Sequence, residues 1–186
     1  TFDAKDAVTT IAALMYGPVS GIIISFLVAF IEAISISGTG VYGFIMNFAS
    51  SAAFSATAAL IYKYKKNSTV AILSFFAASA VMVSVMMALN MLVTPYYMGA
   101  DMSVEAAREQ VITLIPTLIL PFNIAKALLN SAIAMILYKP VSVAMKRAHL
   151  VKGEAKMSFN RSSAAVLITA MLTLACAVII FVILKK

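Results

Sequence analysis

Long apolar stretches, separated by short polar or basic segments, make up most of this chain. A helix of about 20 residues covers the ~30 Å hydrocarbon core of a bilayer, and five of the stretches reach that length. They run over residues 18–36, 43–62, 69–94, 111–139 and 163–184. The pattern therefore predicts an all-α, multi-pass transmembrane helical bundle.

Two shorter segments complete the predicted elements. Residues 4–16 have a helical pattern but are too short to span alone and stop at Gly17-Pro18, which indicates a half-crossing helix. Residues 95–110 are polar, and Ser103 followed by Glu105 predicts the start of a short surface helix there.

Prolines modify the fourth long stretch. Pro116 and Pro121 must kink or split it, so we expect an irregular outer part and a better helix that begins at Pro121. Pro140 follows Lys139, and we expect the span to end there. We find no internal repeat and no low-complexity linker.

Composition supports the membrane assignment and excludes several classes of function. Of the 186 residues, 63% are hydrophobic and 11% charged, and the mean hydropathy is +1.02, whereas soluble domains are about 25% charged. A single cysteine, Cys176, leaves no disulfide framework or thiolate metal site. A phosphate-binding loop and a His-Glu-x-x-His motif are absent, and Glu32 is the only acid within a long span. We therefore expect no enzyme, no catalytic residues, no metal and no catalytic cofactor.

The net charge of +7 comes mainly from a few loops. Lys63, Lys65 and Lys66, and the basic stretch 139–161, should be cytoplasmic by the positive-inside rule. Alternation of the spans then places residues 35–42 and 95–110 outside. We prefer this topology signal over the alternative that the stretch 139–161 binds anionic lipid headgroups, and we expect no nucleic-acid partner.

Amide and charged side chains are rare within the apolar stretches, where each costs several kcal/mol unless it finds a partner or a cavity. By the predicted topology, they all lie in the outer half of the membrane. They are Glu32, Asn47, Asn90, Asn123 and Lys126.

Asn123, Lys126 and Asn130 are spaced i, i+3, i+7 and therefore share one helix face. They would suit a ligand pocket that opens to the outside and is walled by apolar side chains. Alternatively, Lys126 extends to the membrane surface and the asparagines bond neighbouring helices. We favour the pocket, because polar groups from four helices meet at one depth.

Several short motifs have a familiar pattern. The most specific is Pro-Phe-Asn-x-x-Lys at 121–126, and the others are TFDAKD at 1–6, YGPVSG at 16–21, GFIMNF at 43–48 and ALN at 88–90. Over about residues 1–147, the chain with these motifs resembles the substrate-binding membrane subunits, or S components, of energy-coupling factor (ECF) vitamin transporters.

The resemblance implies a six-helix subunit that captures a vitamin from the outside, most similar to the riboflavin-specific members. An FMN-like flavin, thiamin, folate and biotin are alternative ligands, and a non-transport scaffold is an alternative function. Asn90, Asn123 and Lys126 fall on ligand-contacting positions, and Thr1 and Phe2 belong to a loop that covers the pocket. Asn47, Glu32 and Asn130 are further candidates.

The family resemblance also implies partners and a location. The partners would be a transmembrane coupling subunit and two cytoplasmic ATPase subunits, in the cell membrane of a prokaryote. The family's first helix has no counterpart here, and the last span is additional to the six-helix pattern. We therefore expect an S-component-like bundle over 1–147, a basic cytoplasmic loop over 148–162 and an additional transmembrane helix over 163–186.

Overall fold

The structure, a computed structural model, describes residues 4–35, 38, 40–98, 102–152 and 161–185, and within these residues it contains helices and no strand. Five stretches are long and apolar enough to cross a membrane, which confirms the all-α, multi-pass class. The helices are α1 Lys5–Tyr16, α2 Pro18–Ser35, α3 Gly40–Tyr64, α4 Ser68–Val93, α5 Val104–Leu114, α6 Leu120–Arg147 and α7 Arg161–Leu184, with short turns η1 Thr94–Tyr96 and η2 Ile115–Ile119.

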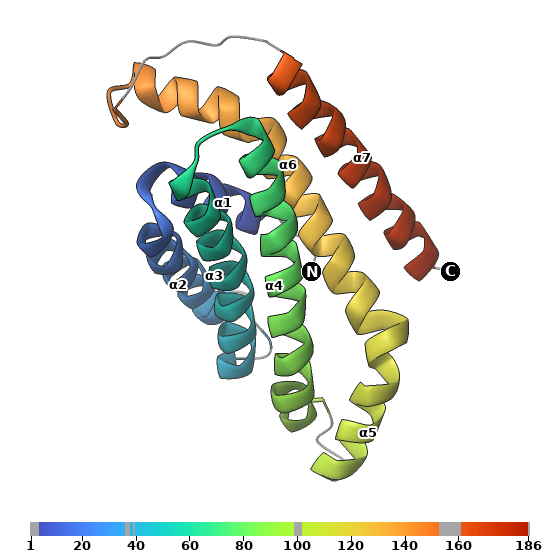
Figure 1. The fold of residues 1–186 in the computed structure, drawn as a ribbon. Helices are drawn as coiled ribbons and strands as arrows, with labels where there is room; N and C mark the ends of the chain where they lie inside the picture. Colours follow the sequence, from blue (N-terminus) through green and yellow to red (C-terminus); the bar gives the residue numbers. More distant parts are fainter. Residues whose placement is uncertain (1–3, 36–37, 39, 99–101, 153–160, 186) are drawn as a thin grey trace.

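The long helices run up and down the bundle in sequence order (Figure 1). α3 packs against α2 and α4, α6 packs against α4, and α7 packs mainly against α6. The turn between α3 and α4 lies at the same end as the last turns of α6, and we call this the lysine-rich end. The end of α2, the start of α3, the end of α4 and α5 lie at the opposite end (Figure 1).

The short helix α1 packs against α2, α3 and α6, as expected for a segment that cannot span alone. It ends at Gly17, whose positive φ of 105° suits glycine. Pro18 then starts α2 with a φ that a first helical turn accepts. A Cβ added to Gly21 would lie 2.7 Å from Ala13 Cβ and 3.1 Å from Ser55 Oγ. The three helices therefore approach one another closely at this glycine.

Of the two prolines in the outer part of the fourth predicted span, Pro116 differs from the sequence expectation and Pro121 agrees with it. Pro116 lies in η2, a π-helical turn, so the outer part of the predicted span is helical and not irregular. Pro121 stands in the first turn of α6, where its missing N–H costs little, and the expected helix start there is confirmed.

The helix does not end at Lys139, where the sequence predicts the end of the span. α6 continues through Pro140 to Arg147, and Figure 1 shows it bending so that its last turns cross the lysine-rich end. A proline inside a helix removes one hydrogen bond and kinks the helix without necessarily ending it. Val143 is buried, and Tyr16 at the end of α1 donates a long 3.5 Å hydrogen bond to the carbonyl of Leu150. Packing of these last turns against the bundle accounts for the continued helix.

Candidate functional site

A buried ion pair joins the first and sixth α-helices. Lys126 Nζ on α6 lies 3.2 Å from Asp6 Oδ2 on α1, and the two side chains are only 10% and 1% exposed. Ser51 on α3 donates a hydrogen bond to the other carboxylate oxygen, Asp6 Oδ1. Three helices therefore meet at one carboxylate inside the bundle.

Asn130 secures the start of α1. Its Oδ1 accepts a 2.9 Å hydrogen bond from the backbone N–H of Ala7, and its Nδ2 donates to the carbonyl of Lys126 at 3.1 Å. The same N–H also donates to the carbonyl of Ala4 at 3.1 Å. Asn130 therefore adds an acceptor from α6 at the start of α1.

A second polar group lies beside the first. Glu32 on α2 forms a salt bridge with Lys5 on α1 and accepts a 3.1 Å hydrogen bond from Asn47 Nδ2 on α3. Lys5 and Asp6 are neighbours in the sequence and carry opposite charges, and each pairs with a different helix. The start of α1 is thereby tied to α2, α3 and α6.

Asn90 lies near the end of α4, at the end of the bundle opposite the lysine-rich turn, and is buried. Its Nδ2 donates to the carbonyl of Met86 at 2.7 Å, and its Oδ1 accepts from the hydroxyl of Thr94 at 3.0 Å. The ring of Tyr97 then stacks on Tyr42 of α3, with centroids 5.7 Å apart.

Asn123 is buried on α6, and its Nδ2 donates to the carbonyl of Ile119 at 2.8 Å. The structure therefore brings Lys126 and Asn130 together around α1 and brings Glu32 together with Asn47. Asn90 and Asn123 bond to carbonyls of their own helical segments. Thr1 and Phe2 lie outside the described residues.

Asp6 and Lys5 are the important polar residues that the sequence reasoning missed as members of this region. An acid near a helix start has an ordinary explanation in the helix dipole, but the Asp6 carboxylate is buried against Lys126. A lysine deep in an apolar helix requires an acidic partner or a cavity, and that rule was the available signal.

The arrangement suits recognition of a polar, uncharged ligand. Amide groups lie among apolar helices in the half of the bundle away from the lysine-rich end, together with two ammonium groups that are each paired with a carboxylate. In the described part of the chain, no group of three or more His, Cys, Asp or Glu side chains is placed to hold a metal ion. The side chains of this region offer hydrogen-bond donors and acceptors.

Comparison with known proteins identifies the class. The family model described as "ECF transporter, substrate-specific component" matches residues 1–138. The chain therefore belongs to the substrate-specific, or S, components of ECF transporters, and it is a multi-pass protein of a prokaryotic cell membrane.

Individual relatives agree with this family. The chain is 30% identical over 147 residues to the riboflavin transporter RibU of Staphylococcus aureus (strain TCH60). The matched region covers 79% of this chain and 77% of that protein. It also resembles a solved S component of a bacterial ECF transporter, with a TM-score of 0.64 and 28% identity over 79% of this chain and 80% of the other.

Proposed function

We propose that this S component captures riboflavin from the extracellular side of the membrane. The observation that carries the proposal is the 30% identity to a riboflavin transporter over most of both chains. The distribution of lysines supports the direction, because it assigns the end with Asn90 and Asn123 to the outside.

Asn90, Asn123 and Lys126 are the proposed ligand contacts. All three are buried on α4 and α6. Amides both donate and accept hydrogen bonds, which matches the edge of an isoalloxazine ring and the hydroxyls of a ribityl chain. Apolar walls would hold the ring faces, as in most small-molecule sites. Thr1 and Phe2 would cover the bound vitamin.

Glu32, Asn47 and Asn130 take a supporting part in this proposal. Glu32 and Asn47 bond to each other, and Asn130 bonds to the backbone of α1. They would act on the ligand through the position of α1, since Lys5 and Asp6 join α1 to both polar groups.

Uptake against a gradient would need partners. We propose association with a transmembrane coupling subunit and two cytoplasmic ATPase subunits, which would hydrolyse ATP on behalf of the S component. Family membership supports this assembly.

The proposal is tested by titrating riboflavin into the purified chain and measuring flavin fluorescence. We expect quenching that saturates at micromolar or lower concentration and is not reversed by excess thiamin, folate or biotin. Absence of quenching would contradict the riboflavin assignment, and reversal by one of the competitors would transfer the assignment to that vitamin.

The site residues are tested by Asn123→Leu and Asn90→Leu. Each replacement nearly keeps the side-chain shape but removes hydrogen-bonding groups, so riboflavin affinity should fall by about 1–3 kcal/mol per substitution, which is about 5- to 150-fold. Ser84→Ala on α4 is the control, because this exposed hydroxyl bonds only to its own helix at Ala80. Unchanged affinity in both asparagine variants would contradict the proposed contacts.

A further inference from the structure

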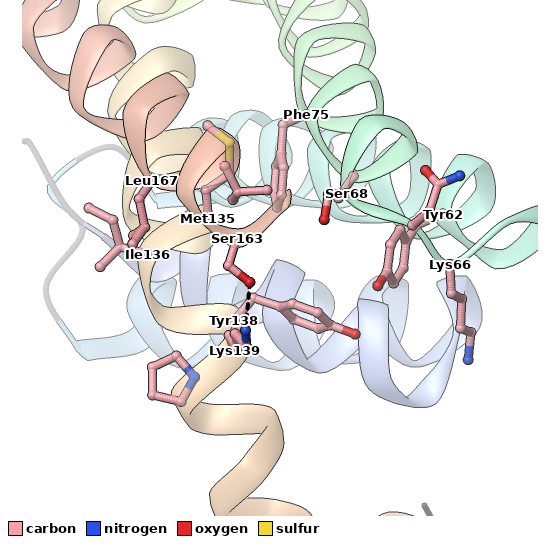
Figure 2. Close-up of a pocket in the computed structure, with 14 residues that line it drawn as sticks. Tyr62, Lys66, Ser68, Phe75, Met135, Ile136, Tyr138, Lys139, Ser163 and Leu167 are labelled. Atoms are coloured by element: carbon pink, nitrogen blue, oxygen red, sulfur yellow. Dashed lines mark hydrogen bonds between the residues drawn. The ribbon is translucent and has the colours of Figure 1, made fainter. Parts of the chain in front are cut away.

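A cavity of about 390 Å³ lies at the lysine-rich end of the bundle, remote from the proposed vitamin site. α4, α6 and α7 and the turn between α3 and α4 form its walls (Figure 2). Its lining residues are Tyr62, Lys66, Asn67, Ser68, Ala71, Phe75, Met135, Ile136, Tyr138, Lys139, Pro140, Ser163, Val166 and Leu167.

The charged side chains at this cavity are both positive. Lys66 is exposed on the α3–α4 turn, and Lys139 is half-buried on α6, where its Nζ donates a 2.6 Å hydrogen bond to Ser163 Oγ of α7. The lining contains no acidic residue among the described residues. The cavity therefore favours an anionic group.

Two long helices begin at the cavity. Ser68 is the first residue of α4 and Ser163 lies in the first turn of α7, and both line the cavity. Each helix N-terminus carries the positive end of the helix dipole. The side chain of Asn67 accepts a hydrogen bond from the N–H of Val70 and so caps the start of α4. These N-termini add to the positive potential of the two lysines.

The rest of the cavity is apolar. Phe75, Met135 and Leu167 line its inner part, and the rings of Tyr62 and Tyr138 meet edge to face with centroids 5.7 Å apart. The neighbouring surface of α7 is also apolar. It exposes Ile168, Met171 and Leu172, each by about 60%. An occupant with an anionic head and hydrocarbon chains would match both parts.

We propose that this cavity binds the phosphodiester headgroup of an anionic phospholipid, with its acyl chains along the apolar surface of α6 and α7. Basic pockets between transmembrane helices on the cytoplasmic side are suited to such headgroups, and anionic lipids are abundant in that leaflet. A lipid there would contact α4, α6 and α7 together and hold α7 against the bundle. In this proposal Lys66 and Lys139 bind the lipid headgroup, and they also contribute to the positive-inside signal that orients the chain.

The test uses a tryptophan reporter, since the chain contains no tryptophan. Tyr138→Trp places the reporter in the cavity wall, and Ile179→Trp places it on the exposed surface of α7 away from the cavity. Each protein is reconstituted into vesicles that contain brominated phosphatidylglycerol or brominated phosphatidylcholine. We expect the cavity reporter to show about a tenfold preference for quenching by phosphatidylglycerol, and the surface reporter to show none.

Charge variants in the Tyr138→Trp background identify the ligand contacts. Lys66→Gln combined with Lys139→Gln should remove most of the preference, and Lys66→Gln alone should lower it about fivefold. The matched control is Lys65→Gln, which removes a neighbouring exposed lysine that does not line the cavity. Because Lys66 is exposed, the single variant retains the fold and provides an independent test.

Three results would overturn the proposal. One is equal quenching of the cavity reporter by both lipids. Another is an equal loss of preference in the Lys65→Gln control and in Lys66→Gln. The third is displacement of the lipid by millimolar glycerol phosphate, because that would show a site for a soluble phosphate and not for a membrane lipid.

Discussion

At the scale of single residues, the ion pair between Lys126 and Asp6 joins α1 to α6 inside the bundle. Each charge alone would be costly in the membrane, and each compensates the other across 3.2 Å. Ser51 contributes a further hydrogen bond to the carboxylate. The pair places Lys126 on a fixed contact with α1, so the position of the ammonium depends on that short helix.

Removing one charge of this pair should be worse than removing both. Lys126→Met leaves a buried carboxylate unpaired, and we expect a stability loss of about 3–5 kcal/mol. Asp6→Asn combined with Lys126→Met should recover most of that loss. Thermal unfolding of the two single variants and the double variant in detergent measures the coupling.

The same double variant separates stability from recognition. If Lys126 contacts riboflavin, the double variant Asp6→Asn, Lys126→Met should be nearly as stable as the unchanged protein but should bind the vitamin weakly. Lys63→Met, at the exposed end of α3, is the control for loss of a lysine. Additive losses in the single and double variants would contradict the pairing of Lys126 with Asp6.

The sequence could show that Lys126 needs a partner, but it could not identify Asp6. The two residues are far apart in the chain, and Asp6 also fits the ordinary preference for acids at a helix start. Asn130 was placed correctly on the face of Lys126. Its hydrogen bond to the α1 backbone depends on packing that periodicity does not contain.

At the scale of helices, Gly21 allows α1, α2 and α3 to pack closely. The nearest atoms to an added Cβ belong to Ala13 and Ser55, and neither can move aside as the end of a long side chain could. Ser25 and Ser55 also approach each other, with hydroxyl oxygens 3.4 Å apart. Small residues at such contacts are common where transmembrane helices associate.

Gly21→Ala should therefore destabilise the chain by about 1–3 kcal/mol, the usual cost of overpacking. Gly38→Ala is the matched control, since an added Cβ there meets nothing within 4 Å. The melting temperatures of both variants check the expectation. Equal melting temperatures would mean that α2 can shift away from α1 at little cost.

Helix positions were largely predictable, because apolar length and basic turns define them directly. The prolines were the exception. Local rules expect a break after Lys139, but tertiary packing keeps α6 helical to Arg147 with a bend instead. Whether a proline ends or bends a helix depends on what the following turns contact, and one sequence does not contain that information.

At the scale of the whole molecule, α7 is distinct from the rest of the bundle. The family model ends at residue 138, and α7 packs along the outer side of α6 (Figure 1). The sequence could predict this additional span from its apolar length. It could not predict the cavity beside it, because the cavity requires residues from three separated parts of the chain.

Truncation after Lys152 should distinguish the two proposed sites. The shortened chain should retain riboflavin affinity, because Asn90, Asn123 and Lys126 lie on α4 and α6. It should lose the phosphatidylglycerol preference, because Ser163, Val166 and Leu167 of α7 are gone. Fluorescence titration and the cavity reporter measure the two effects separately. Loss of both together would mean that α7 is required for the fold of the bundle.

The paired charges at the start of α1 have an electrical consequence. Lys5 with Glu32 and Asp6 with Lys126 sum to zero. Moving one elementary charge through 100 mV takes about 2.3 kcal/mol, whereas this neutral group of side chains contributes no net electrical work when it moves. A variant that removes one of the four charges would leave a net charge, and any movement of α1 across the membrane would then include an electrical cost that the paired group avoids.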